Sequence, residues 1–127
     1  MKALIVTGSR HGLAVSTDEY TEKLLPFLEG VGLLIHGCAE GVDTIFSKLA
    51  TEHCIIQLPM EAQWNQHGPV AGPLRNEHMV NVGLALKATG WTVTAAAFPG
   101  PNSRGTKNCI KLLKAACIPT TITSIGL

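Results

Sequence analysis

The sequence predicts an α/β protein with a Rossmann-like, doubly wound and mainly parallel five-stranded sheet that carries helices on both faces. Three observations predict this fold. Short apolar segments alternate with longer amphipathic segments, Gly-rich turns follow several of the apolar segments, and no low-complexity stretch breaks the alternation. The 127 residues suit one domain, residues 1–127, because typical domains have roughly 100–150 residues.

Three near-continuous apolar runs predict the strands of the first half of the chain. Such runs are typical of parallel strands that are buried on both faces of a sheet. The helix between the second and third strands is expected to extend from Val42 to about Glu52, after a Gly-rich turn. The strands themselves are expected over residues 3–7, 32–36 and 54–58.

The helix after the first strand is predicted from a cap and a stop signal. Ser16 and Glu19 have the spacing of a capping box, in which Ser16 is the N-cap residue. Pro26 predicts a kink or an early end, and Gly30 follows the last turn. The helix is expected to direct these apolar side chains toward the core: Tyr20, Leu24, Leu25, Phe27 and Leu28.

The second half of the chain is expected to begin with a long loop over residues 59–72 that contains Trp64. Loops of about 12–15 residues are uncommon unless they are functional. A helix follows from Pro73, a residue tolerated in a first turn, and closes at Gly90. The last elements are expected to be a strand over 91–98, a helix from 106 to about 116 and an edge strand over 118–122, which contains Pro119.

Composition excludes several classes of protein. The net charge is +1 and only 15% of residues are charged, so no broad attraction to nucleic acid or to an anionic membrane is expected. No apolar run approaches the roughly 20 residues that span a bilayer, and residues 1–7 lack the features of a signal peptide. We therefore expect a cytoplasmic protein with no nucleic-acid and no membrane partner.

The four cysteines show no C-x-x-C pair and lie in or beside apolar segments. They are therefore expected to be buried free thiols. The five histidines are scattered and no H-E-x-x-H occurs, so neither a metal site nor a cofactor is expected. The cysteines are Cys38, Cys54, Cys109 and Cys117.

Three polar, Gly-rich turns are expected at one edge of the sheet. In an open parallel sheet, ligands bind beyond the carboxyl ends of the strands, where the strand order reverses. Helix N-termini expose unpaired amides and the positive end of the helix dipole there, so they favour phosphate. Together the turns predict a phosphate-bearing ligand, although no P-loop, G-x-G-x-x-G or G-x-S-x-G motif is present. The turns span residues 8–12, 36–43 and 98–106.

Five motifs in order over about residues 3–122 resemble those of the SLOG superfamily, in the branch of small bacterial and phage proteins. They are Gly8-Ser9-Arg10, His36-Gly37 with Ala39-Glu40-Gly41-Val42-Asp43, a lone Trp64, the segment 71–79 (AGPLRNEHM) and Ser103-Arg104-Gly105-Thr106. The resemblance implies a Rossmann-like sheet that binds nucleotides or nucleotide-derived ligands, in a homo-oligomer such as a dimer or tetramer. Some members, the Lonely Guy enzymes, cleave the N-glycosidic bond of nucleoside monophosphates. Others bind ADP-ribose-type signals in bacterial defence.

One segment departs from the Lonely Guy pattern P-G-G-x-G-T-x-x-E. Asn102 and Ser103 lengthen the loop, and Cys109 stands where the pattern has its catalytic Glu. A carboxylate at that position would stabilise a cationic centre or orient water, which a thiol does poorly.

Each candidate residue also has a purely structural interpretation. Arg75 is placed to bind a phosphate through a bidentate contact of its guanidinium or to form a salt bridge with Glu77 or Glu40. Asp43 is a ribose acceptor, an acid/base group, or an acid favoured by the helix dipole. Trp64 either stacks on a base or covers the core.

The same choice applies to the polar groups of the turns. Asn76 contacts the ligand or bonds the backbone of a neighbouring loop. Thr106, with Ser103, either holds phosphate or caps a helix. The full set of expected ligand contacts is Gly8, Ser9, Arg10, Gly37, Glu40, Asp43, Trp64, Arg75, Asn76, Gly100, Ser103, Arg104, Gly105 and Thr106.

The expected function is therefore binding, for sensing or sequestration, of a nucleotide-derived small molecule, for which an ADP-ribose-type signal is a candidate. The alternative is a small hydrolase that cleaves an N-glycosidic bond of a nucleotide. In that case Glu40, Asp43 and Arg75 would be the catalytic residues.

Overall fold

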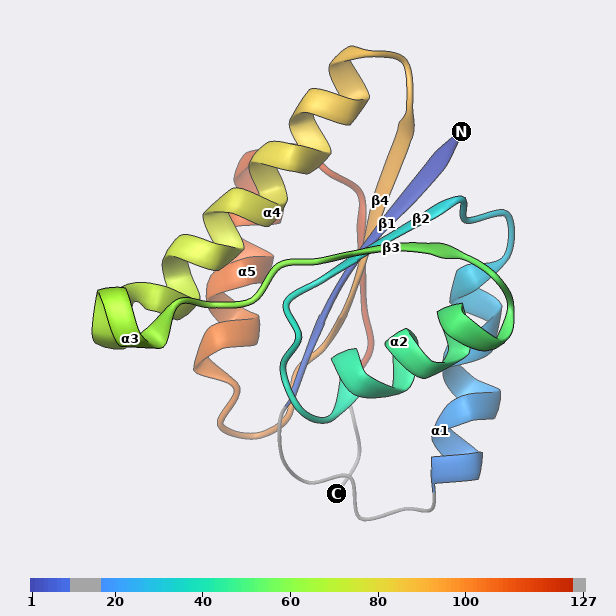
Figure 1. Cartoon of the computed structure of the whole chain (residues 1–127), viewed down its shortest axis with the longest axis horizontal. Coiled ribbons are helices and arrows are strands. Elements are labelled where there is room, and N and C mark those ends of the chain that lie inside the picture. Colours follow the sequence, from blue (N-terminus) through green and yellow to red (C-terminus); the bar gives the residue numbers. More distant parts are fainter. Residues whose placement is uncertain (10–16, 125–127) are drawn as a thin grey trace.

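An all-parallel sheet of five strands runs through the centre of the computed structural model, which describes residues 1–9 and 17–124 (Figure 1). The strand order is β3-β2-β1-β4-β5, and this confirms the predicted Rossmann-like α/β class. The edge position of the last strand, which follows Pro119, is also as predicted. The strands are β1 (Lys2–Gly8), β2 (Leu33–His36), β3 (Ile56–Pro59), β4 (Thr92–Phe98) and β5 (Thr120–Ile122).

The strand order reverses beside β1, and this position determines where a ligand site is expected. The chain builds outward from β1 through β2 to β3, then crosses back to place β4 on the other side of β1. Gly8 and Phe98 are register partners at the carboxyl ends of β1 and β4. Doubly wound proteins bind ligands at this kind of switch point.

Helices cover both faces of the sheet (Figure 1). On one face lie α1 (Thr17–Leu24), which continues into the 3-10 turn η1 (Leu25–Leu28), and α2 (Val42–Glu52). On the other face lie α4 (Ala71–Ala88) and α5 (Arg104–Ala115). Because the strands are apolar on both faces, each helix layer closes its own hydrophobic cluster.

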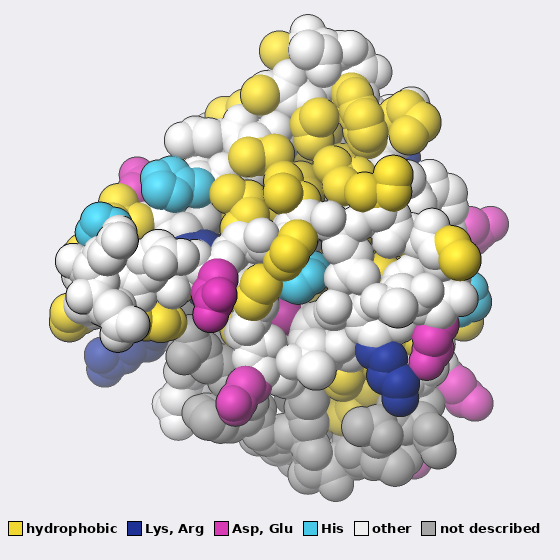
Figure 2. Space-filling view, in the orientation of Figure 1, with side chains coloured by type: hydrophobic (Ala, Val, Ile, Leu, Met, Phe, Trp, Pro, Cys, Tyr) yellow, Lys and Arg dark blue, Asp and Glu magenta, His cyan; other side chains and the backbone are white. Residues whose placement is uncertain are grey.

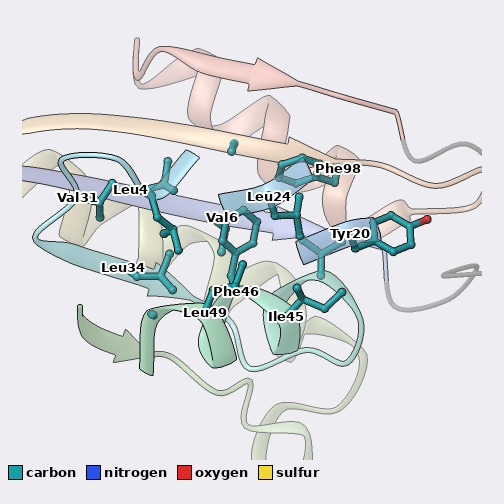
Figure 3. Packing of buried hydrophobic residues seen from close by; sticks show 14 residues of the cluster. Leu4, Val6, Tyr20, Leu24, Val31, Leu34, Ile45, Phe46, Leu49 and Phe98 are labelled. Atoms are coloured by element: carbon teal, nitrogen blue, oxygen red, sulfur yellow. The ribbon is translucent and has the colours of Figure 1, made fainter. Parts of the chain in front are cut away.

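The cluster between the sheet and α1 and α2 is built around aromatic rings (Figure 3). Phe98 at the end of β4 packs edge-on against Phe27, with ring centroids 5.2 Å apart, and lies 5.7 Å from the ring of Phe46. Phe46 is fully buried on α2. This packing anchors the end of β4, from which one of the Gly-rich turns departs.

The cluster under α4 and α5 depends on close approach of α4 to the sheet. A Cβ at Gly83 would lie 2.8 Å from Ile5 Cδ1, so a larger residue would force the Ile5 side chain to shift. Met79 and Leu113 are buried on the same face. This contact places the N-terminal half of α4 beside the strand ends.

The predicted loop over residues 59–72 is wrong in part. The segment contains a helical turn, α3 (Trp64–His67), and a 3-10 turn, η2 (Gly68–Val70), and α4 already begins at Ala71. Pro73 is therefore the third residue of α4, where its missing amide hydrogen costs nothing. In the same way α5 begins at Arg104 instead of 106, so that Gly105 lies inside its first turn.

The helix after the first strand also differs from the prediction. It ends at Leu24, and Pro26 converts the rest into η1, because proline cannot continue the α-helical bonding. The change of geometry leaves Leu25 exposed rather than in the core, whereas Tyr20, Leu24 and Leu28 are buried. The expected Ser16 cap lies outside the described residues.

The prediction of four buried thiols is wrong for three of them. Cys38, Cys54 and Cys117 are exposed, and only Cys109 is buried; all four are free. The three exposed cysteines have φ between 56° and 58°, the left-handed conformation of turn residues. Their position in turns beside apolar segments, not within them, explains their exposure.

The apolar residues of α4 differ in exposure. Val80 is buried, Val82 and Leu86 are half-buried, and Leu84 is exposed. Apolar side chains gather above β3 and beside the C-terminal half of α4 in Figure 2. None of the helices in the described part of the chain has the length and apolar character needed to cross a membrane.

Candidate functional site

A cleft of about 270 Å³ opens at the carboxyl ends of β1 and β4, at the switch point of the sheet. Its walls come from the ends of β1 and α2, from α4 and from the turn that begins α5. Nine of the residues expected to contact a ligand line it together with four others. The lining is Thr7, Gly8, Ser9, Ala39, Asp43, Arg75, Asn76, Met79, Asn102, Ser103, Arg104, Gly105 and Thr106.

Close backbone packing forms the base of this main cleft. The Ser9 amide donates to the Phe98 carbonyl over 3.0 Å, which extends the pairing of β1 with β4 by one residue. A Cβ at Gly8 would lie 2.6 Å from Val42 Cβ, and one at Gly100 would lie 2.7 Å from Ser9 Oγ. Packing against Val42 therefore requires glycine at position 8, and a side chain at Gly100, which lies outside the lining, would displace the Ser9 hydroxyl.

The turn after β2 is closed by a side chain of its own. Asp43 Oδ2 accepts the amide hydrogens of Gly37 over 3.0 Å and of Ala39 over 3.2 Å. Between them, the Cys38 amide donates to His36 Nδ1 over 3.1 Å. Three successive amides of this Gly-rich turn are thus already satisfied by the protein.

The other oxygen of Asp43 is buried and unsatisfied. Asp43 is buried, with 4% of its surface exposed, and Oδ1 has no hydrogen-bond partner among the described residues. Burial raises the pKa of this carboxyl, against the opposing effects of the Ala39 amide, His36, the Gly37 amide and Arg75. A buried carboxyl in this state accepts a donor from a ligand or holds a proton to higher pH than usual.

His36 has a structural role in the neighbouring network. Since Nδ1 accepts from Cys38, the proton of the neutral ring is on Nε2, which donates to Gln57 Oε1 over 3.2 Å. The Gln57 amide group in turn donates to the Ser47 carbonyl and to Thr51 Oγ1. The network joins β2, β3 and α2 and holds the turn after β2 in place.

Arg75 connects α4 to that same turn. Its Nε donates to Asn76 Oδ1 over 2.9 Å, and Nη1 donates to the Gly37 carbonyl. A Cβ at Gly37 would collide with the guanidinium, so glycine leaves room for Arg75 in this position. Neither Glu40 nor Glu77 forms an ion pair within residues 1–9 and 17–124, so the expected alternative of a salt bridge is wrong.

Asn76 connects α4 to the start of α5. It is fully buried, and its Nδ2 donates to the Gly105 carbonyl over 3.1 Å and to Asn108 Oδ1 over 3.0 Å. Its side chain therefore bonds the backbone of a neighbouring segment, as one of the two interpretations from the sequence proposed. Asn76 fixes where the N-terminus of α5 lies.

The N-terminus of α5 is the part of the main cleft with open backbone donors. Ser103 is the N-cap residue, but it makes no capping bond, because its Oγ accepts the Gly100 amide over 2.7 Å. The amides of Gly105 and Thr106 have no acceptor in the described part of the chain. Arg104 is exposed beside them. These donors and the helix dipole favour an anion at this end of the cleft.

Cys109 lies beneath this turn and is unsuited to catalysis. Burial raises the pKa of its thiol to about 11, although a hydrogen bond from Thr7 and the charge of Arg75 act in the opposite direction. The thiol is therefore neutral at physiological pH and a poor nucleophile.

The structure separates some predicted contacts from the main cleft. Gly37, Glu40 and Trp64 line a neighbouring cleft, which shares Arg75 and Ala39 with the main one. Arg10 lies outside the described residues. Among the residues that are described, no group of three or more metal-ligating side chains occurs.

Sequence reasoning missed four residues of the lining: Thr7, Ala39, Met79 and Asn102. Thr7 ends a strand that the sequence predicts to be buried, and Met79 is the last residue of the quoted segment 71–79. Ala39 and Asn102 lie inside turns that had been recognised. The available signal was therefore membership of a quoted motif for Ala39 and Met79, and adjacency to one for Thr7 and Asn102.

The fold and the cleft at its switch point define this chain as a doubly wound α/β protein of the Rossmann-like class. The chain is 31% identical to the "Gene 61 protein" of Mycobacterium phage D29, over an alignment that covers 94% of each sequence. It belongs to the same family as that phage protein. No family model and no solved structure matches the sequence.

Proposed function

We propose that this protein is a member of the SLOG superfamily that binds a nucleotide-derived small molecule in the main cleft, to sense or sequester it. An ADP-ribose-type signal is the candidate ligand. The observation that carries the proposal is the open N-terminus of α5, where the Gly105 and Thr106 amides lack acceptors beside Arg104. The kinship with a phage protein is compatible with sequestration of a host signal.

The two ends of the main cleft suit different parts of a nucleotide. A phosphate at the N-terminus of α5 would accept the two amides and the Arg104 guanidinium. Asp43 Oδ1, the buried oxygen without a partner, would accept a ribose hydroxyl. Binding would thus satisfy polar groups that the protein leaves unsatisfied.

Binding without turnover is favoured over hydrolysis by Cys109. This thiol occupies the position of the catalytic Glu in the Lonely Guy pattern, and its pKa of about 11 keeps it neutral. One observation supports the hydrolase as second candidate: Asp43 has a raised pKa, as a general acid requires. Glu40 lines only the neighbouring cleft, so it is a weaker candidate for catalysis.

A nucleotide panel with calorimetric readout tests this proposal. We expect nucleoside monophosphates and ADP-ribose derivatives to bind, and chromatography to recover them unchanged. Arg104→Ala should lower the affinity about tenfold, by the loss of one charge-assisted contact. Lys111→Ala is the matched control, because it removes an exposed cation of the same helix outside the cleft. Binding of no nucleotide would overturn the proposal, and base release abolished by Asp43→Ala would establish the hydrolase.

The proposal includes a cytoplasmic homo-oligomer, a dimer or tetramer, without nucleic-acid or membrane partners. The exposed apolar side chains of Ile56 and Leu84 support self-association, since such surface is costly in water. Native mass spectrometry of protein purified from cells reports both the stoichiometry and any retained metabolite. A monomeric mass at micromolar concentration would contradict this part.

A further inference from the structure

A second cleft of about 270 Å³ lies next to the main one, on the other side of Arg75. Ala39 and Arg75 line both clefts, so the two clefts are adjacent. The distinctive side chains of the second cleft are Glu40, Glu61 and Trp64. Acidic side chains are visible between α3 and the N-terminal end of α2 in Figure 2.

The second cleft is electrically negative although Arg75 lines it. Glu40 and Glu61 are exposed, and neither carboxylate has an ion-pair partner in the part of the chain that the structure describes. Cys38 also lines this cleft, and the pKa of its thiol reflects the surrounding charges. Its pKa is raised first by burial and then by Glu61 and Asp43, and the opposing effect of Arg75 is smaller.

Trp64 supplies an aromatic wall. It is the first residue of α3, and 45% of its surface is exposed. The outer end of its ring packs over the backbone of Gly72, where a Cβ would lie only 3.1 Å from Cη2. The start of α4 therefore holds the indole in position. An indole with carboxylates nearby is the combination that recognises organic cations.

The main cleft has the opposite polarity. There the Gly105 and Thr106 amides, the dipole of α5 and Arg104 favour an anion. We propose that the second cleft binds a positively charged heteroaromatic ring, so that the ligand is a nucleotide with a cationic base. Its phosphate would lie in the main cleft and its base against Trp64. This inference rests on the proposed nucleotide binding and adds the charge of the base.

A pair of nucleotides that differ by one methyl group tests the inference. 1-Methyladenosine 5′-monophosphate carries a positively charged base at neutral pH, and AMP carries a neutral one. In Trp91→Phe protein, Trp64 is the sole tryptophan, so its fluorescence reports on the second cleft. We expect the methylated nucleotide to quench Trp64 and to bind about tenfold more tightly than AMP, in line with a partly desolvated cation–π contact.

Charge-removing variants identify the source of that preference. Glu40→Gln combined with Glu61→Gln should reduce the preference to about twofold or less, because it lowers the affinity for the methylated nucleotide more than the affinity for AMP. Glu77→Gln is the matched control, because it removes an exposed carboxylate of α4 that lines neither cleft. It should retain the full preference. Circular dichroism of each variant checks that the fold is intact.

The outcomes separate this inference from the proposed function. Equal binding of the two nucleotides, or a preference that survives in the double variant, overturns the cationic-base inference and leaves nucleotide binding in place. If neither nucleotide binds, the proposed function fails. Titration with N-methylpyridinium alone then tests whether the second cleft binds an organic cation. Saturable quenching of Trp64 that the double variant loses supports a cation site in the second cleft, and its absence overturns that site.

Discussion

The turn after β2 and the turn that begins α5 border the same cleft, and both are rich in glycine. In the first, Asp43 and His36 accept the amides of residues 37–39. In the second, the Ser103 hydroxyl is occupied by the Gly100 amide, and the Gly105 and Thr106 amides stay open. A Gly-rich turn thus indicates exposed backbone N–H donors. Whether a ligand can bind them depends on whether neighbouring side chains already accept their hydrogen bonds.

Asp43 can be viewed as an internal anion. Its Oδ2 occupies a nest of amides in the turn after β2, of the kind that otherwise binds a phosphate. The open N-terminus of α5 lacks such an internal partner. The contrast explains why we assign the phosphate to α5 and only a hydroxyl to the remaining oxygen of Asp43.

Removal of the internal anion should have the largest effect. Asp43→Ala leaves the Gly37 and Ala39 amides without acceptors, and each lost bond to a charged group is worth about 1.5–3 kcal/mol. We expect the free energy of unfolding in urea to fall by about 3 kcal/mol. Thr44→Ala is the control: it removes one exposed bond to the Ala39 carbonyl and should cost under about 1 kcal/mol. Equal losses in the two variants would show that Asp43 does not close the turn.

The pH dependence of stability provides a sharper test of the same residue. Below the ordinary Asp pKa of 3.8, Asp43 is protonated in both the folded and the unfolded state and carries no penalty. As the pH rises from there through the raised pKa of the folded state, the unfolded state loses its proton first. The folded state then loses about 1.4 kcal/mol for each unit by which its pKa is raised.

Asp43→Asn removes this titration and keeps an oxygen for the two amides. The free energy of unfolding of the wild type, minus that of the variant, should therefore fall as the pH rises above 3.8 and level off above the raised pKa. Urea unfolding of both proteins across this pH range measures the difference. The contributions of the other carboxyl groups are the same in both proteins and cancel. Parallel curves would contradict a raised pKa.

The sheet and most helix bounds could be predicted because local patterns determined them. Val42–Glu52 matches α2 as expected, since a Gly-rich turn and an apolar periodicity define both ends. The prediction was wrong where a helix begins without a local signal. Val70 precedes α4 with no side-chain cap, and Ser103 makes no capping bond to α5. Tertiary contacts, such as those of Asn76, determine these starts instead.

The candidate site could be located from the sequence, but the roles of its residues could not. Motif order and the switch-point rule brought Ser9, Asp43 and Arg104 to one cleft. The interpretation of Arg75 as a phosphate ligand depended on where its side chain points, and the structure shows it bonded to Gly37 and Asn76. Trp64 was assigned to the same cleft edge as the phosphate contacts, and the structure places it in the lining of the neighbouring cleft. Tertiary contacts determine which cleft a loop residue lines, and the spacing of residues in the sequence does not predict these contacts.

The smallest change in stability is expected from giving the α5 turn the internal anion that it lacks. Ser103→Asp places a carboxylate at the N-cap position, where it can accept the Gly105 or Thr106 amide and interact with the helix dipole. We expect the free energy of unfolding to rise by about 0.5–1 kcal/mol, while the affinity for AMP falls at least about tenfold. Urea unfolding and calorimetry measure the two effects.

The opposite signs of these two effects distinguish a ligand site from a structural turn. Ser103→Asn caps the helix without a charge and should give a similar gain in stability with a smaller loss of affinity. If Ser103→Asp binds AMP as tightly as the wild type does, the amides of the α5 turn do not hold the phosphate. Neither Gly-rich turn would then bind the phosphate through its amides, and the anion would have to lie elsewhere in the cleft.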